Sequence, residues 1–192
     1  MQVCYLHGFN SSHRSFNYIQ NKLPAHEIIP INFDSHQPFA LSLVDIEKQL
    51  PKTPFSFVTH SLGGLAAVYL AEKLQNRVKA IVSISAPFGG SKAAIALRWV
   101  PGYPKVFEDI TPGSATISRL TTLKIKAPLL SIISVGGNLP TTSEQNDSVV
   151  TIASQKALPY GKKVEVKANH FEVVMHEKTI SLIEDFLFER EV

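Results

Sequence analysis

One stretch in the first half of the chain constrains the fold more than any other, because it changes abruptly from strand-like to helix-like. Residues 55–59 are apolar and β-prone, as in a buried strand, whereas residues 65–74 are rich in Ala and Leu, as in a buried helix. Gly63 and Gly64 lack a Cβ, which lets the start of that helix pass close to the strand. The sequence therefore predicts a sharp turn that holds the Ser61 hydroxyl above the edge of a sheet.

Apolar runs that alternate with helix-like patterns surround this stretch. Alternation of this kind predicts βαβ units and a parallel sheet, and continuous apolar strands are typical of sheets buried on both faces. Pro30 indicates that its own strand lies near the edge of the sheet. We expect an α/β fold of about six mostly parallel strands with helices on both faces. The expected strands are residues 3–6, 27–33, 55–59, 78–84, 129–135 and 163–167, and a helix is expected over residues 149–158.

Residues 88–126 break this alternation and are too long for an ordinary loop. Two pieces of the segment have helical patterns, so we expect a helical insertion that acts as a cap or lid within a single domain spanning residues 1–192. Phe88, Trp99 and Tyr103 could line or cover a substrate pocket there. The plain alternative is that these aromatic side chains form the core of a small subdomain.

The composition excludes several classes of protein. A net charge of +3 with scattered Lys and Arg gives no support for nucleic-acid binding. Cys4 is the single cysteine, no signal peptide is recognisable, and no apolar run approaches the ~20 residues that span a bilayer. We therefore expect a cytoplasmic protein with no transmembrane segment. No metal and no cofactor are expected, because no His/Cys/Asp cluster has ligand spacing; the oligomeric state is left open.

A serine hydroxyl becomes a useful nucleophile only beside a base, and the base needs an acidic group to orient it. His170 directly follows the strand expected at residues 163–167, and Asp147 follows the one at 129–135. Because the carboxyl ends of parallel strands share one edge of the sheet, we expect Ser61, Asp147 and His170 to meet there. Each has a structural alternative: a helix N-cap for Ser61 or Asp147, and an ordinary loop histidine for His170.

Other acids and histidines fit these roles less well. His176 resembles the start of the last helix, and His60 is expected to be structural because it points away from its neighbour in the turn. Asp109 lies inside the insertion rather than after a strand, and Glu144 is a weaker alternative still.

The segment Thr59 to Gly63 resembles the nucleophile elbow Gly-x-Ser-x-Gly of the α/β-hydrolase family, with threonine in place of the first glycine. The family's chain order of Ser, Asp or Glu, and His is also met. The resemblance covers essentially the whole chain and implies a minimal six-stranded version of the fold, as in small bacterial lipases. It implies that Ser61 is the nucleophile, His170 the base and Asp147 the acid that orients the base.

Two further segments carry the resemblance. His7-Gly8 after the first strand is similar to the family's oxyanion loop, which implies that the backbone N–H groups of Phe9 and Leu62 hold the oxyanion; a simple turn is the alternative. Residues 85–91 and 109–114 resemble the lipase and deacylase branch that contains PGAP1-like serine esterases. In that branch the corresponding segment covers the acyl-binding groove.

The function implied is a serine hydrolase that cleaves a small-molecule ester or a lipid ester through an acyl-enzyme intermediate. We expect its activity to rise with pH as His170 loses its proton. An acyltransferase or a thioesterase would use the same three residues. A non-catalytic binding protein with this fold is the third alternative.

Overall fold

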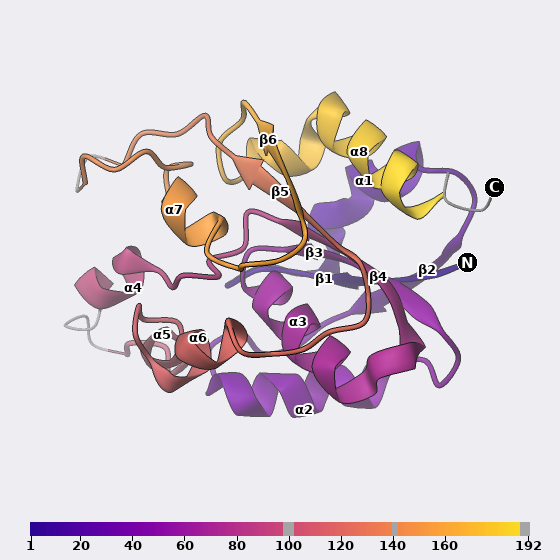
Figure 1. Cartoon of the computed structure of the whole chain (residues 1–192), viewed down its shortest axis with the longest axis horizontal. Coiled ribbons are helices and arrows are strands. Elements are labelled where there is room, and N and C mark those ends of the chain that lie inside the picture. The colour runs from indigo at the N-terminus through magenta and orange to yellow at the C-terminus, as the bar shows by residue number, and fades with distance from the viewer. Residues whose placement is uncertain (98–101, 140–141, 189–192) are drawn as a thin grey trace.

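The computed structural model describes residues 1–97, 102–139 and 142–188. At its centre lies one six-stranded sheet with the order β2-β1-β3-β4-β5-β6, in which every neighbouring pair is parallel (Figure 1). The predicted fold class is therefore confirmed, and Pro30 lies in the edge strand β2, as predicted. The strands are β1 (Gln2–Leu6), β2 (Glu27–Ile31), β3 (Phe55–His60), β4 (Val78–Ile84), β5 (Leu129–Ser134) and β6 (Lys162–Val166).

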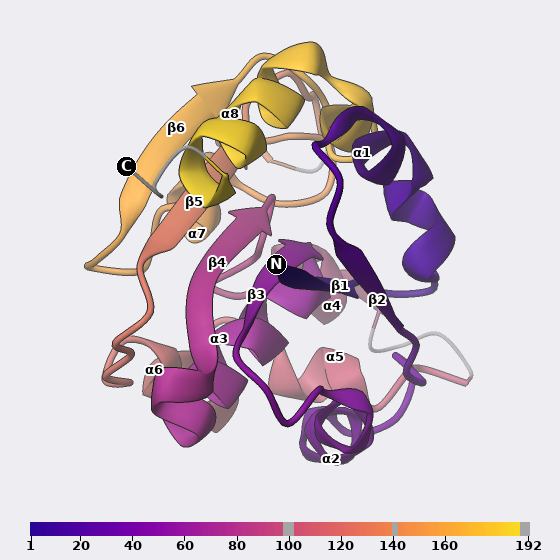
Figure 2. The ribbon, with the colours of Figure 1, turned by 90° about the vertical axis from the view of Figure 1, so that its right-hand side faces the viewer.

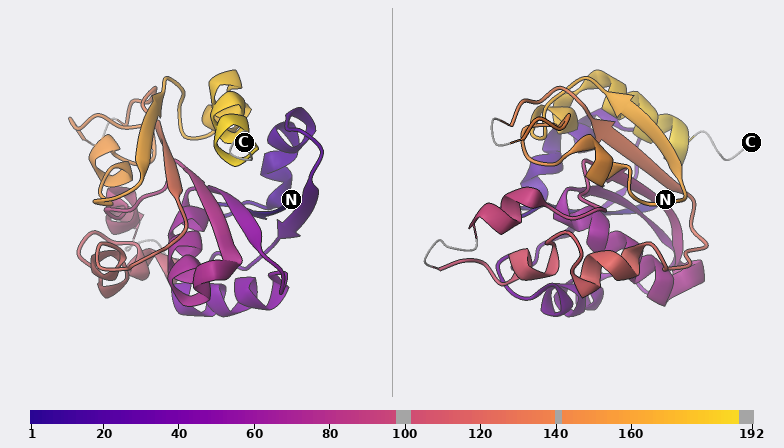
Figure 3. Two further views of the ribbon diagram at one scale, coloured as in Figure 1. Left: turned by 45° about the vertical axis from the view of Figure 1, so that its right-hand side comes forward. Right: turned by 60° about the vertical axis from the view of Figure 1, so that its left-hand side comes forward.

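Helices cover both faces of this sheet. The helices packed on its two faces include α1 (Asn17–Lys22), α2 (Phe39–Gln49), α3 (Leu62–Leu74) and α8 (Glu177–Leu187). In β1 alternate side chains enter two cores: Val3 packs with residues of α1 and α8, and Cys4 packs with residues of α2 and α3. Figures 2 and 3 show these two helical layers on opposite sides of the sheet.

The strand order reverses beside β1, and this reversal decides where a site can form. The chain passes from β1 to β2 on one side and then to β3 on the other, so loops diverge from the carboxyl ends of β1 and β3. In open parallel sheets, ligands bind in the crevice that such a divergence leaves. Ser61 follows the last residue of β3 at this point.

The insertion holds α4 (Lys92–Leu97), α5 (Val106–Asp109) and α6 (Ala115–Leu120), of which α5 was not predicted from the sequence. Buried residues of α5 and α6 join the core beneath α2 and α3. Asp109 accepts a hydrogen bond from the backbone N–H of Phe39 at 2.8 Å, so its carboxylate caps the start of α2. Trp99 lies outside the described residues, and the role of the insertion as a lid stays a prediction.

Four short helices complete the fold: η1 (His13–Phe16), η2 (Gln75–Arg77), α7 (Ile152–Gln155) and η3 (Glu172–Met175). The helix expected over residues 149–158 is wrong in extent, because α7 begins only after Thr151. The Thr151 hydroxyl caps α7 by accepting from the Ser154 N–H at 3.2 Å. Within the described ranges, no helix is long and apolar enough to cross a membrane.

Candidate active site

Ser61 lies at the apex of the turn between β3 and α3. Its backbone has φ 52° and ψ −120°, a left-handed conformation that is uncommon for a residue with a side chain. The turn is anchored by the Ser61 N–H, which donates to the carbonyl oxygen of Ile84 at 2.8 Å. The Ser61 side chain makes no capping hydrogen bond to α3, so the N-cap alternative does not describe it.

The two glycines that follow Ser61 let α3 start close to the sheet. A Cβ on Gly63 would lie 2.3 Å from the carbonyl oxygen of Leu6, and one on Gly64 would lie 2.3 Å from Oγ of Ser83. Both distances are far below van der Waals contact. The turn therefore needs glycine at these two positions for reasons of space alone.

A continuous line of hydrogen bonds runs from Ser61 into the protein. Nε2 of His170 lies 3.1 Å from Oγ of Ser61, and Nδ1 of His170 lies 2.7 Å from Oδ2 of Asp147. Because an ionised carboxylate only accepts, Nδ1 carries the proton and the lone pair of Nε2 faces the serine hydroxyl. His170 and Asp147 are buried, whereas Ser61 is partly exposed.

The carboxylate of Asp147 accepts hydrogen bonds at both oxygens. Oδ1 accepts from the backbone N–H groups of Val149 and Val150 at 2.9 and 2.7 Å. Oδ2 accepts from the Ser134 hydroxyl at 2.5 Å and from Nε2 of Gln155 at 3.1 Å, besides His170. Burial pushes the pKa of Asp147 upward, but these hydrogen bonds and the charge of a protonated His170 outweigh it and hold the pKa below its ordinary value.

A cavity of about 690 Å³ opens beside Ser61 and His170. The segment after β1 contributes Gly8, Phe9 and Arg14 to its wall, and η3 with the residue before it contributes Phe171 and Val174. Ser61 and His170 therefore lie at the opening of one cavity, at the point where the loops after β1 and β3 diverge.

Residues 7–126 match the family model described as alpha/beta hydrolase fold. The chain belongs to the α/β-hydrolase fold family. That match covers the turn and Ser61 but ends before Asp147 and His170. No curated protein sequence matches the chain.

Solved structures show the same fold in this α/β-hydrolase over nearly its whole length. It resembles the metagenomic carboxyl esterase MGS0156 (TM-score 0.76, 16% identity, 96% of this chain and 73% of that one). It also resembles the mature lipase BlEst2 of Bacillus licheniformis (TM-score 0.70, 15% identity, 95% and 89%). A third similar structure is the lin2722 gene product of Listeria innocua (TM-score 0.68, 14% identity, 100% and 95%). At these identities the likeness shows the fold alone.

Two of the expected substrate-binding aromatic residues, Phe88 and Tyr103, do not line this cavity. Phe88 is only 1% exposed and belongs to the core beneath α3, so it has almost no surface to offer a ligand. The Tyr103 hydroxyl donates to the carbonyl oxygen of Ala94 at 2.8 Å, and its ring packs on Phe107. Within the described ranges, no residue of 88–126 lines the cavity. The physical cause is that the buried apolar residues of the insertion join the core formed with α2 and α3.

Two polar side chains that hold Asp147, Ser134 and Gln155, were not predicted from the sequence. Ser134 ends β5, and its hydroxyl also lies 2.6 Å from the hydroxyl of Ser85 at the end of β4. Gln155 is fully buried in α7 and accepts from the Ser134 N–H at 2.9 Å. Glutamine is seldom buried, so a glutamine in an apolar stretch could have drawn attention to Gln155. The residue to which it hydrogen-bonds cannot be identified from spacing along the chain.

The other histidines of this region have structural contacts. Nε2 of His60 donates to the carbonyl oxygen of His170 at 2.8 Å, and burial lowers the pKa of His60 to about 3, so that it stays neutral. Nδ1 of His7 donates to the carbonyl oxygen of Gly8 at 2.8 Å, and its ring stacks on Phe33. His176 caps α8, with Nδ1 accepting from the Lys178 N–H. These contacts agree with the structural role expected for His60.

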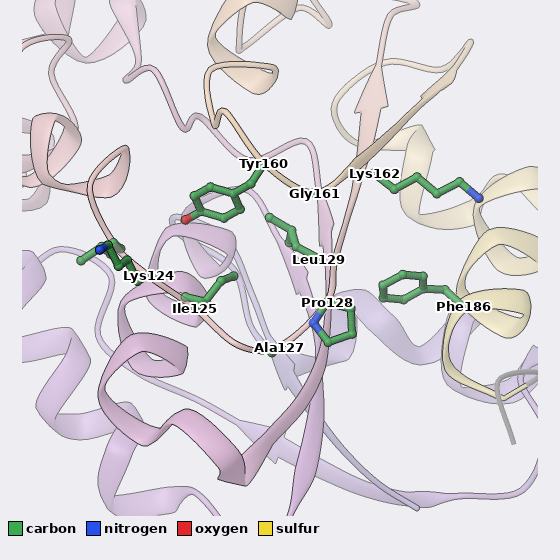
Figure 4. A pocket seen from close by; sticks show the side chains of 10 residues that line it. Lys124, Ile125, Ala127, Pro128, Leu129, Tyr160, Gly161, Lys162 and Phe186 are labelled. Carbon is green, nitrogen blue, oxygen red and sulfur yellow. The ribbon is translucent and has the colours of Figure 1, made fainter.

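A second cavity, of about 500 Å³, lies at the other end of the sheet (Figure 4). Leu129 and Lys162, the first residues of β5 and β6, line it together with Tyr160 and Phe186. The described residues that line it include no serine, histidine or carboxylate, so they offer no activated serine nucleophile. Among the described residues, no group of three or more His, Cys, Asp or Glu side chains could hold a metal ion.

Proposed function

We propose that this α/β-hydrolase is a serine hydrolase that cleaves carboxylic esters. The observation that carries the proposal is the hydrogen-bonded line from Ser61 through His170 to Asp147, which ends at a cavity in the crevice of the sheet. The esterase and lipase among the similar structures support the same class of reaction.

Acylation uses this line directly. The Ser61 oxygen forms a bond to the ester carbonyl carbon while Nε2 of His170 takes the hydroxyl proton. Asp147 stabilises the imidazolium through Nδ1, which lies 2.7 Å from its carboxylate. When the tetrahedral intermediate collapses, the bond from the carbonyl carbon to the alcohol oxygen breaks, and His170 returns the proton to the departing alcohol.

The oxyanion of that intermediate needs aimed donors, and we assign this role to the backbone N–H groups of Phe9 and Leu62. Leu62 is the first residue of α3, where helical N–H groups have no partner within the helix. Phe9 lines the cavity, and a Cβ on its neighbour Gly8 would lie only 3.0 Å from Cβ of Ser61. Loss of one such donor costs about 10²–10³ in rate in a serine protease.

Deacylation repeats the proton transfer in reverse order. His170 removes a proton from water, the water oxygen bonds to the acyl carbon, and the bond from that carbon to the Ser61 oxygen breaks. Ser61 recovers its proton from His170, and the carboxylic acid leaves. An acyltransferase would pass the acyl group to an alcohol instead of water at this step, and a thioesterase would differ only in the first leaving group.

Covalent labelling with a fluorophosphonate tests the proposal. The native chain should label and should hydrolyse short p-nitrophenyl esters, whereas Ser61→Ala should lose both properties. Ser118→Ala is the matched control, because Ser118 is an exposed serine of α6. Equal labelling of the native chain and Ser61→Ala would refute the assignment of the nucleophile.

The substrate arms of the same assay separate the alternatives. A series of p-nitrophenyl esters of increasing acyl length gives the chain-length preference. Competing alcohols distinguish transfer from hydrolysis, and a matched thioester distinguishes the leaving group. A chain that neither labels nor turns over any of these substrates would be a binding protein.

A further inference from the structure

The cavity beside Ser61 has two chemically different walls. One wall is apolar and comes from the end of the chain, where Phe171 and Met175 are 66% and 56% exposed beside Val174. The second wall comes from the segment after β1 and the start of α1, where Asn10, Ser11, Arg14 and Asn17 give it a polar character beside Phe9 and Tyr18. A ligand that fills this cavity therefore meets both apolar surface and hydrogen-bond donors.

Arg14 gives the polar wall its charge. Among the described residues that line the cavity there is no Asp, Glu or Lys, so Arg14 is its one permanently charged side chain. Its guanidinium makes no hydrogen bond or ion pair within the described ranges. Glu172 lies in η3 between Phe171 and Val174 but does not line the cavity, and its Oε2 accepts from the Asn169 N–H at 3.5 Å. The next acid, Glu177, bonds to Tyr18 and lies 3.7 Å from Lys22.

The neighbours of Arg14 are also open to a ligand. In the described part of the chain, the side chains of Asn10, Ser11 and Asn17 have no hydrogen-bond partner. Asn10 has φ 50°, and its backbone N–H donates to the Ser35 hydroxyl at 2.9 Å, which fixes this bend of the wall. A planar guanidinium flanked by amide and hydroxyl groups suits a carboxylate or phosphate oxygen.

We propose that this site takes amphiphilic esters that carry an anionic group, with the anion bound at Arg14 and the apolar part against Phe171, Val174 and Met175. This inference rests on the proposed function, because it names the substrate class of the Ser61 site. A neutral ester would fill the apolar wall equally well but would leave the exposed guanidinium of Arg14 bonded only to water. The anion adds a charge-assisted hydrogen bond at a site where no protein carboxylate competes for the same donor.

A matched pair of substrates tests the inference: the mono-p-nitrophenyl ester of adipic acid, which is an anion, and the neutral p-nitrophenyl hexanoate. The ratio of kcat/KM for the anionic ester to that for the neutral ester should fall about ten-fold in Arg14→Gln, the size of one hydrogen bond to a charged group. Arg14→Lys should retain part of the ratio because it keeps the charge but not the planar fork. The ratio in the native chain should also fall as salt is added.

Lys22→Gln is the matched control. It removes a nearby cation that pairs with Glu177 and does not line the cavity, so the ratio should stay at the native value. A ratio that is the same in the native chain and in Arg14→Gln would overturn the inference while leaving the esterase intact.

A binding measurement separates this inference from the proposed function. Titration calorimetry on Ser61→Ala with octyl phosphate, and with octyl glucoside as the neutral amphiphile, needs no turnover. Octyl phosphate should bind more tightly, and Arg14→Gln combined with Ser61→Ala should remove that advantage. If neither ester is hydrolysed but this difference is found, the proposed function fails and the anionic binding site stands. Equal binding of the two amphiphiles overturns the site.

Discussion

The turn that carries Ser61 and the loop that carries Asp147 position their side chains in different ways. In the turn, a left-handed backbone and two glycines packed against the sheet fix where the serine stands. In the loop, hydrogen bonds from Ser134, Gln155 and the amides of the following residues fix where the carboxylate points. The turn is fixed by steric contacts close to Ser61 in the sequence. The loop is fixed by hydrogen bonds between residues that lie farther apart in the sequence.

This difference predicts different consequences of mutation. Steric crowding in the turn acts on folding, because the start of α3 and the end of β1 cannot separate without disturbing the core. Loss of a donor in the loop acts on the ionisation and direction of one carboxylate. The loop also depends on one close approach, since a Cβ on Gly137 would lie 1.9 Å from the carbonyl carbon of Asp147. That glycine sets the path of the backbone, but the hydrogen bonds decide the rotation of the side chain.

The largest effect is expected for Asp147→Asn, which keeps the shape of the side chain and removes its charge. The amide can donate toward His170, which favours the tautomer with its proton on Nε2 and leaves nothing to accept the Ser61 proton. By analogy with the same change in a serine protease, kcat for ester hydrolysis should fall about 10³–10⁴-fold. Steady-state kinetics on a p-nitrophenyl ester measures this.

Glu144→Gln controls for loss of an acid from the same loop, because Glu144 pairs with Lys92 at the surface. This control should keep nearly all of the activity. An Asp147→Asn variant within ten-fold of the native kcat would show that the carboxylate does not support the reaction, and the contrast between turn and loop would then have no functional meaning.

The second effect is expected for Gly63→Ala. The new Cβ would meet the carbonyl oxygens of Leu6 and His7 at 2.3 and 2.8 Å, and backbone atoms at the end of β1 have little freedom to move. Overpacking of this kind should lower the free energy of unfolding by about 3 kcal/mol, as measured by urea denaturation.

Gly113→Ala provides the control for this substitution. A Cβ at Gly113 would meet nothing within 4 Å, although its φ of +82° still disfavours alanine, so the expected loss is about 1 kcal/mol. Equal losses at the two positions would mean that backbone conformation, rather than crowding, accounts for the glycine in the turn.

The same contrast explains how much the sequence predicted. The strand, the turn and the helix around Ser61 are contiguous, so their apolar pattern and the glycines were enough to predict the sharp turn. The six-stranded parallel sheet was predicted for a similar reason, since its central strands β1, β3, β4 and β5 are largely apolar runs that alternate with helical patterns. The candidate site could be assembled from topology, because residues that follow parallel strands share one edge.

Prediction failed where tertiary contacts outweigh local pattern. Phe88 was expected at the pocket, but an aromatic side chain in an insertion can be buried by any neighbour, and here it lies in the core shared with α2 and α3. The helix expected from residue 149 begins at Ile152, because the N–H groups of Val149 and Val150 donate to Asp147 instead. Ser134 and Gln155 hydrogen-bond between β5 and α7, and their spacing along the chain does not predict this contact.

The smallest effect is expected for Ser134→Ala, which removes one donor from the Asp147 carboxylate. The pKa of Asp147 lies below its ordinary value, so its contribution to stability is present at neutral pH and is lost as pH falls through the lowered pKa. Without the Ser134 hydroxyl that pKa should rise toward the ordinary value. The free energy of unfolding at pH 7 should then fall by about 1.5–2 kcal/mol, and acid unfolding should begin at a higher pH.

Ser131→Ala in the same strand is the matched control for this prediction. Ser131 is equally buried, but in the described part of the chain its hydroxyl has no hydrogen-bond partner, so its removal should leave the stability unchanged or raise it slightly. Urea denaturation at pH 7 and circular dichroism during acid titration compare the two variants. If both variants lose the same stability with the same pH dependence, the effect of Ser134→Ala comes from its buried place in β5 and not from its hydrogen bond to Asp147. The loop would then be held sterically, as the turn is.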